Sequence, residues 1–195
     1  MIILGLTGSI GMGKSTTATM FRDLGIDVYD SDASVHELYT KEALAPLSVH
    51  FPDAIEGSRV DRKKLGDQVF KDKSKLALLE QILHPLVRDK ENAFLKTCRN
   101  MRKPMVVLDI PLLFEKRKRS DFDYIVVVTA SAQEQKQRVL SRPGMTEDKF
   151  NSILAQQIDD QQKRKAAHFI IQTGLGLASA RKQVEVIVRS TLGHE

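Results

Sequence analysis

The sequence predicts an α/β fold, in which a five-stranded parallel sheet is flanked by helices on both faces. Two observations carry this prediction: short apolar, β-branched runs recur along the chain, and stretches with helical patterning separate them. Such alternation is typical of a parallel sheet, because each crossover between parallel strands needs a long connection, usually a helix. The five expected strands are residues 2–7, 26–29, 105–108, 124–129 and 169–173.

The N-terminal run, residues 2–7, is apolar at nearly every position, as expected for a strand that is buried on both faces. No basic segment precedes this run and a glycine-rich loop follows it, so we do not expect a signal peptide. A helix is predicted over residues 15–24, ending at Gly25, because glycine readily adopts the left-handed conformation that terminates helices. The second strand follows at once.

A long polar region with helical patterning separates the second strand from the third, at about residues 31–103. Four leucines recur there at helical spacing: Leu76, Leu79, Leu83 and Leu86. Pro85 is expected to bend or interrupt this helix. Because so large an insertion in a small α/β protein usually adds a binding face, we expect this region to bind substrate.

After the fourth strand, Ser131 and Glu134 have the spacing of a capping box, and the helix that they open carries Arg138 and Arg142. Thr146 is expected to begin a further helix. We interpret this region, about residues 131–165, as a short lid.

A chain of 195 residues is long enough for one substantial core and short for two. We therefore expect residues 1–195 to form a single domain, with a helical insertion and a lid added to its core. The core is expected at about residues 1–30, 104–130 and 166–195.

The composition, 42% hydrophobic and 28% charged, is that of an ordinary globular protein. A net charge of +5 indicates an anionic ligand or a mild affinity for nucleic acid, without separating the two. The single cysteine, Cys98, excludes an internal disulfide and a Cys-rich zinc site. No apolar run approaches the roughly 20 residues of a membrane helix, so we expect a cytoplasmic protein without a membrane partner.

Residues 8–15, Gly-Ser-Ile-Gly-Met-Gly-Lys-Ser, fit the phosphate-loop pattern G-x-x-x-x-G-K-[ST] between a strand and a helix. The glycines let successive N–H groups turn toward phosphate oxygens, and the helix adds its positive end. Lys14 would reach the β- and γ-phosphates, and the Ser15 hydroxyl would bind Mg²⁺. The expected ATP-binding residues of the loop are Gly11, Met12, Gly13, Lys14, Ser15 and Thr16. The alternative is a flexible glycine turn with an incidental lysine.

The third strand ends in Asp109, as in the Walker B pattern, whose aspartate acts at the metal. This signal is weak alone, because an aspartate often follows an apolar strand, but the phosphate loop strengthens it. The two motifs predict a P-loop NTPase fold. The sequence lacks the Asn-Lys-x-Asp motif with which switch GTPases read their base, and this favours a kinase.

Asp30 and Asp32 directly follow the second strand, and the carboxyl ends of parallel strands border the ligand crevice. An aspartate there can accept the proton of an attacking hydroxyl during phosphoryl transfer. The alternative is structural, because Ser31 or Asp32 could instead cap the next helix.

Further motifs are Asp-Ser-Asp at residues 30–32, Val-Asp-Arg-Lys-Lys-Leu at 60–65, His-Pro at 84–85 and Ile-Pro-Leu-Leu-Phe-Glu at 110–115. Together with the opening at residues 4–16, they resemble the dephospho-CoA kinase family over nearly the whole chain. Arg138, Arg142 and Gln156 fall at the family's Arg-x-x-x-Arg and downstream Gln positions. The phosphate loop is generic, whereas the combination of the other motifs is specific.

By this resemblance, Asp32 is the catalytic base or orienter of the acceptor hydroxyl, and Asp30 supports it. The resemblance places Thr7, His84, Leu112, Leu113, Phe114 and Glu115 at the acceptor. His84 could instead be a helix-start histidine, and the apolar residues of 112–114 could be plain core. Three departures from the family pattern, at Ser152, His168 and Gln172, put the adenine-side contacts in question.

Arg138 and Arg142 are four residues apart and share one helix face, where they could neutralise charge on the transferring phosphoryl group. A solvated face is the alternative. Lys14 and Arg138 join Asp32 as the expected catalytic residues, and Arg142, Gln172 and Gly174 are expected at the nucleotide.

The resemblance implies ATP-dependent phosphorylation of the ribose 3′-hydroxyl of dephospho-CoA, with Mg²⁺, as the last step of coenzyme A biosynthesis. ATP and dephospho-CoA are the expected small-molecule partners, with no nucleic acid, and the oligomeric state is left open. One alternative is a P-loop kinase for a nucleoside monophosphate or another small molecule. Another is a basic nucleotide-binding module that controls nucleic-acid association, although this leaves the Asp-x-Asp and Pro-Leu-Leu-Phe-Glu motifs unexplained.

Overall fold

A computed structural model describes residues 1–69 and 72–193 of the chain. It divides into two compact units. The first, which we call the sheet unit, comprises residues 1–29 together with the chain from residue 98 onward. The second, the helical unit, comprises residues 30–97. No helix among the described residues is long and apolar enough to cross a membrane.

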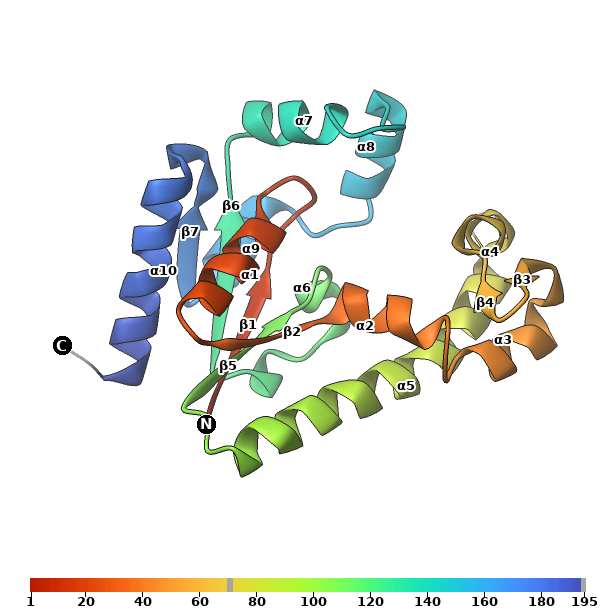
Figure 1. Ribbon diagram of the computed structural model, residues 1–195. Helices are drawn as coiled ribbons and strands as arrows, with labels where there is room; N and C mark the ends of the chain where they lie inside the picture. Colours follow the sequence, from red (N-terminus) through yellow and green to blue (C-terminus); the bar gives the residue numbers. More distant parts are fainter. Residues whose placement is uncertain (70–71, 194–195) are drawn as a thin grey trace. The chain divides into compact units, whose positions relative to one another are not determined.

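The sheet has five parallel strands in the order β2-β5-β1-β6-β7 (Figure 1). They are β1 (Ile2–Thr7), β2 (Asp27–Asp30), β5 (Met105–Asp109), β6 (Tyr124–Thr129) and β7 (Phe169–Gln172). Central β1 pairs with β5 through Ile2 opposite Met105, and with β6 through Leu4 opposite Tyr124. All five predicted strands are confirmed, with bounds shifted by one residue at most.

The shift at β2 has a local cause at the end of α1 (Lys14–Asp23). The N–H of Ile26, which was expected in the strand, donates to Phe21 O at 3.1 Å and so closes the helix terminus. Gly25 provides the left-handed residue of that turn, with φ of +78°. The strand therefore starts one residue later.

Both faces of the sheet are covered, which explains why its strands are continuously apolar. Helix α1 and helix α10 (Leu177–Leu192) pack on one face. The core there includes Leu4, Leu6, Val126 and Val128 of the strands and Phe21 and Val184 of the helices. On the other face the short helix α6 (Leu113–Lys116) lies against Gly5, where a Cβ atom would be only 2.6 Å from Leu113 Cδ1.

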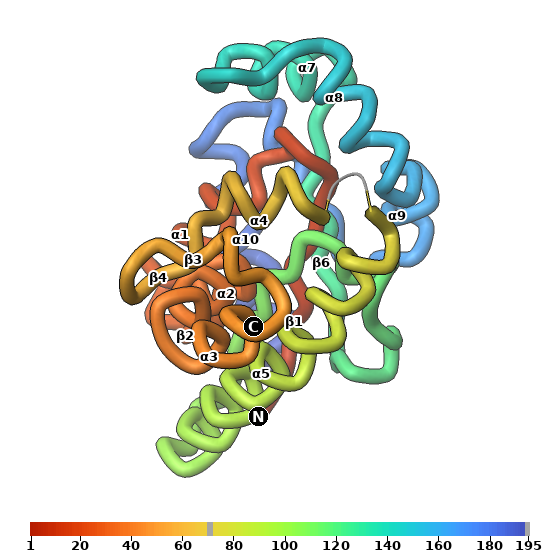
Figure 2. Tube along the Cα trace, turned by 90° about the vertical axis from the view of Figure 1, so that its right-hand side faces the viewer, coloured from red at the N-terminus to blue at the C-terminus, as the bar shows by residue number. Residues whose placement is uncertain are grey.

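Between β6 and β7 the chain forms α7 (Ala132–Leu140), α8 (Glu147–Leu154) and α9 (Asp160–Ala166), in cyan to blue in Figure 2. The predicted capping box is present: Glu134 N donates to Ser131 Oγ at 3.2 Å, and Ser131 N donates to Glu134 Oε2 at 3.1 Å. Thr146 caps α8, as predicted. Short 3₁₀ helices occur at Arg119–Asp121 and, directly after β7, at Thr173–Leu175.

The helical unit has its own apolar core, built around Leu38, Leu47, Phe51, Leu65 and Leu83. Its helices are α2 (Ser31–Leu38), α3 (Leu44–His50), α4 (Arg62–Val69) and, up to residue 97, α5 (Lys73–Asn100), with a 3₁₀ turn at Pro52–Ala54. A small antiparallel hairpin, β3 (Ile55–Glu56) and β4 (Arg59–Val60), was not predicted. Two residues per strand are too few for a recognisable alternation of polar and apolar positions.

Helix α5 continues through Pro85, so of the bend or interruption expected there, the interruption does not occur. Proline removes the hydrogen bond to the carbonyl of residue 81. Both Pro85 and Gln81 are exposed, so water can satisfy that carbonyl group.

Candidate active site

The phosphate loop joins the carboxyl end of β1 to the first turn of α1. Gly11 and Gly13 have φ of +78° and +92°, conformations that favour glycine, and Gly13 is the N-cap residue of α1. No side chain of the described residues caps this helix. Its first N–H groups, with the positive end of the helix dipole, therefore remain available for an anion.

The two nucleotide motifs meet beneath this loop. Lys14 Nζ lies 2.6 Å from Oδ1 of Asp109, which ends β5 and is 1% exposed. Ser15 and Thr16, in the first turn of α1, are exposed. The arrangement places an ammonium group, a carboxylate and an exposed hydroxyl together at the carboxyl edge of the sheet.

A pocket of about 260 Å³ adjoins the loop. Its lining includes Gly11, Gly13, Thr16, Arg138, Arg142, Thr173 and Leu177. Arg138 and Arg142 both border the pocket that adjoins the loop. Helix α7 ends at Leu140, however, so Arg142 lies beyond it and the predicted shared helix face was wrong. Arg142 is exposed and Arg138 is half-buried.

Arg138 is held by Thr173, in the turn that follows β7. Its Nη1 donates to Thr173 Oγ1 at 3.0 Å, and its Nη2 donates to Thr173 O at 3.1 Å. The Thr173 hydroxyl in turn donates to Met12 O at 2.7 Å. Thr173 therefore joins α7 to the phosphate loop, a role for which the sequence offered no signal.

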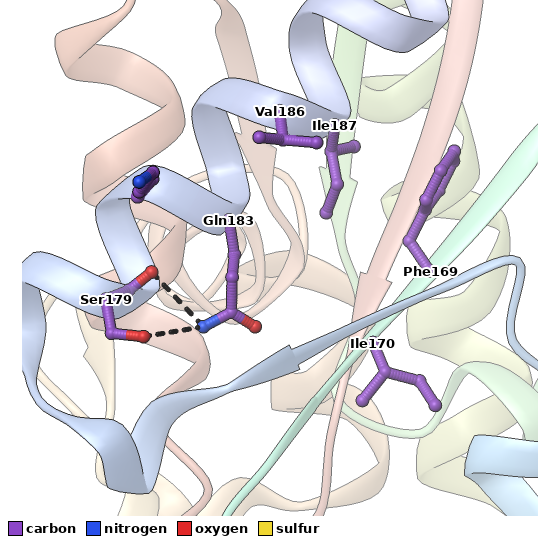
Figure 3. A pocket seen from close by; sticks show the side chains of 7 residues that line it. Phe169, Ile170, Ser179, Gln183, Val186 and Ile187 are labelled. Atoms are coloured by element: carbon purple, nitrogen blue, oxygen red, sulfur yellow. Dashed lines mark hydrogen bonds between the residues drawn. The ribbon is translucent and has the colours of Figure 1, made fainter.

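A side chain of α10 binds the main chain of Gln172 and so fixes the turn there. Gln172 N donates to Gln183 Oε1 at 2.8 Å, and Gln183 Nε2 donates to Gln172 O at 3.3 Å. Figure 3 shows Gln183 extending from α10 toward β7, beside Ser179, whose carbonyl and hydroxyl oxygens also accept from its amide. These bonds hold the backbone of residue 172 without any contribution from its own side chain.

Gly174 lies against the carboxylate of Glu134. A Cβ atom at residue 174 would lie 2.8 Å from Glu134 Cδ, so any larger residue here would displace the Glu134 carboxylate. Hydrogen bonds from the Ser131 side chain and then from its backbone hold the pKa of Glu134 below its usual value, and Arg138 adds to this. Gly174, which was expected at the nucleotide, is thus contacted in this structure by a side chain of α7.

In the helical unit, Asp30 is the N-cap of α2, and its Oδ1 accepts from Ala33 N at 2.9 Å. The cap is thus neither Ser31 nor Asp32, the two residues considered for it. Asp32 lies in the first turn of α2 and is exposed, with no hydrogen bond or ion pair to another described residue. His84 is exposed in the interior of α5, so it is not a helix-start histidine.

Two of the residues expected at the acceptor are instead buried in the sheet unit. Thr7 is fully buried and its hydroxyl donates to Pro111 O at 3.2 Å, which ties β1 to the segment after β5. Leu113 is also fully buried and packs against Gly5, so the plain-core alternative holds for it. The acceptor role of these two residues stays a prediction; Leu112 and Phe114 are half-buried.

Glu115, at the end of the same motif, makes two contacts with the region after α8. Its Oε1 accepts from Ile158 N at 2.8 Å and lies 3.0 Å from Lys163 Nζ. His168, a departure from the family pattern, has a structural bond: its Nδ1 accepts from Ile125 N at 2.9 Å. That nitrogen is therefore unprotonated.

Two glutamines that the sequence analysis did not single out contact the phosphate loop. Gln135 Nε2 donates to Ile10 O at 2.8 Å, and Ile10 N donates to Gln157 Oε1 at 3.1 Å. Gln156, the expected family glutamine, is exposed. Helical spacing was a signal for Gln135, because it lies one turn before Arg138 on the same face of α7.

Comparison with known proteins identifies the family of the chain. The family model for dephospho-CoA kinase matches residues 2–178. A dephospho-CoA kinase from Mesorhizobium japonicum is 52% identical over 193 residues, covering 99% of this chain and 98% of that protein. The solved dephospho-CoA kinase from Campylobacter jejuni is 26% identical with a TM-score of 0.75, covering 99% and 98% of the two chains.

A shikimate kinase from Acinetobacter baumannii, solved with shikimate, is 18% identical with a TM-score of 0.54. The match covers 100% of this chain and 95% of that one, and it shows a shared P-loop kinase fold. The chain is thus a kinase that belongs to the dephospho-CoA kinase family.

Proposed function

We propose that this protein transfers the γ-phosphoryl group of ATP to the ribose 3′-hydroxyl of dephospho-CoA and so completes coenzyme A. The observation that carries the proposal is the Lys14–Asp109 pair, 2.6 Å apart under an open glycine loop. This is the machinery of a P-loop phosphotransferase. Family membership supplies the acceptor, because the related proteins are named for it.

The phosphate loop and the adjoining pocket would bind the nucleotide. The N–H groups at the start of α1 suit the phosphates, and Lys14 would leave Asp109 to contact the β- and γ-phosphates. Arg138 and Arg142, on the lining of the pocket, would neutralise charge as the phosphoryl group transfers. We assign region 131–165, which carries both arginines, as the lid.

The donor groups at the loop fit Mg²⁺. The exposed Ser15 hydroxyl and the Asp109 carboxylate are both hard oxygen ligands. No group of three or more His, Cys, Asp or Glu side chains within residues 1–69 and 72–193 is placed to hold a metal. A protein that offers one or two oxygens and leaves the rest to phosphates and water is typical of Mg²⁺. When bound, the ion would neutralise charge on the phosphates.

Asp32 would accept the proton of the ribose hydroxyl or orient it. Its carboxylate is exposed and has no described partner, so it is available to a ligand. Asp30 supports it indirectly: by capping α2 it fixes the first turn, in which Asp32 lies. The exposed His84 and residues 112 and 114 are our proposals for further acceptor contacts.

The direct test is ADP formation with ATP and Mg²⁺, in the presence and absence of dephospho-CoA. We expect ADP release to depend on dephospho-CoA and coenzyme A to accumulate in equal amount. Shikimate and nucleoside monophosphates serve as control acceptors. Turnover with one of these acceptors but not with dephospho-CoA would contradict the proposal.

A further inference from the structure

The main chain of Ile10, within the phosphate loop, is bound on both sides by glutamine amides. Gln135 of α7 holds the carbonyl group at 2.8 Å, and Gln157 accepts from the N–H group at 3.1 Å. Gln135 is 6% exposed. An amide that supplies one donor and another that supplies one acceptor fix the orientation of both peptide groups that flank Ile10. Two points of region 131–165 therefore control the direction in which this part of the loop points.

Gln157 lies in the short connection between α8 and α9, and this connection is itself anchored. Its Ile158 N–H donates to Glu115 Oε1 at 2.8 Å. The same oxygen lies 3.0 Å from Nζ of Lys163, whose side chain is fully buried on α9. Asp160 adds a second anchor, because its Oδ2 accepts from the Thr129 hydroxyl at 2.7 Å.

The Glu115–Lys163 ion pair ties its two elements together mainly because breaking it would leave a buried charge without a partner. The Glu115 side chain is 12% exposed, so removal of Lys163 would leave a carboxylate that is largely shielded from water. The pair joins α6, which follows the Asp109 strand, to α9. The α8–α9 connection is thus fixed to α6, which follows Asp109, and its Gln157 binds the phosphate loop at Ile10.

We propose that Gln157 is a positioning residue for the phosphate loop, and that the Glu115–Lys163 pair acts through it by holding the α8–α9 connection. This inference rests on the proposed function of the loop in binding ATP. It also gives Glu115 a role different from acceptor contact. A loop whose N–H groups are oriented before the ligand arrives binds phosphate with a smaller ordering cost, so loss of Gln157 should weaken ATP binding.

The first experiment compares Gln157→Ala and Gln157→Met with Gln162→Ala, a control at an exposed glutamine on α9. We expect the dissociation constant of ATP, measured by calorimetry, to rise about tenfold in both Gln157 variants. KM for dephospho-CoA should stay within about twofold. Methionine keeps the size of the side chain but lacks the amide acceptor, so normal ATP binding in Gln157→Met would overturn the proposal by showing that packing suffices.

The second experiment asks whether Lys163 acts through Gln157, with Lys165→Met as the matched control on the exposed side of α9. Lys163→Met should weaken ATP binding in the wild-type background and change it by less than about twofold in Gln157→Ala. If Lys163→Met and Gln157→Ala instead weaken ATP binding additively, the proposed coupling between the two residues is wrong. Should Lys163→Met fail to fold, Glu115→Gln carries the same test, because its amide keeps the shape and weakens the attraction.

The two proposals fail in different ways. If the chain is not a dephospho-CoA kinase, wild-type protein will lack acceptor-dependent turnover while its ATP binding still responds to Gln157. If the positioning role is absent, turnover will be normal and ATP binding in Gln157→Ala will match the control.

Discussion

The nucleotide region and the acceptor carboxylate are built in opposite ways. Around the phosphate loop, hydrogen bonds hold the main chain in place: Thr173 donates to Met12 O, and glutamine side chains bind both main-chain groups of Ile10. Lys14 is the exception, because in our proposal it leaves Asp109 to contact the phosphates. Asp32, by contrast, is exposed and its carboxylate has no partner among the described residues. In our proposal the phosphates would meet a preorganised loop, whereas the acceptor hydroxyl would meet a carboxylate fixed only by the first turn of a helix.

This contrast fits the demands of phosphoryl transfer. The triphosphate carries most of the charge, so the groups that stabilise it must be oriented in advance. The base has one proton to accept, and a carboxylate without competing bonds remains free to accept it. Changes at the nucleotide region should therefore affect ATP binding and turnover together, and changes at Asp32 should affect turnover alone.

Removal of divalent metal should have the largest effect, because it leaves Ser15 and Asp109 without the ion that they are proposed to bind. We expect EDTA to abolish turnover and Mg²⁺ or Mn²⁺ to restore it. The measurement is ADP formation after chelation and after readdition of the metal. An enzyme that turns over normally in EDTA contradicts the assignment of both residues.

Arg138→Ala should lower kcat by about 10² and change KM for dephospho-CoA less, because the contact that we propose with the phosphoryl group would strengthen in the transition state. Gln137→Ala, at an exposed neighbour on α7, is the control. Steady-state kinetics with each substrate varied in turn separates the two constants. A change in KM alone would mean that Arg138 only docks the acceptor.

Gln172→Ala should have the smallest effect. Because Gln183 binds both main-chain groups of residue 172, the turn should keep its shape without the glutamine side chain. We expect the ATP-to-GTP ratio of kcat/KM to stay within about threefold of wild type. A loss of tenfold or more would show that the side chain itself reads adenine.

The features that the sequence predicted well have local signals. Strands such as β1 and β6 are apolar runs, the phosphate loop is a contiguous motif, and the capping box of α7 needs only Ser131 and Glu134. The start of β2 differed from the prediction because Ile26 N donates to the end of α1 and so cannot belong to the strand.

The features that were missed depend on contacts between distant segments. The bond from Gln157 to Ile10 spans 147 residues, and the bond from Arg138 to Thr173 depends on how α7 follows β6. Thr7 and Leu113 carry residue types that suit either a site or a core, and their burial against the segment after β5 and against Gly5 has no local signal in the sequence. Burial of this kind is a property of the fold and leaves no local pattern.

The most direct test of the contrast is Asp32→Asn, measured beside Asp67→Asn, an exposed carboxylate on α4 of the same unit. The amide keeps the shape of the side chain but is a far weaker base, so we expect kcat to fall by about 10² or more. The dissociation constant of ATP should remain within about twofold of wild type. A wild-type kcat, or a loss of ATP binding equal to the loss of turnover, would contradict the division between a preorganised nucleotide region and a free acceptor carboxylate.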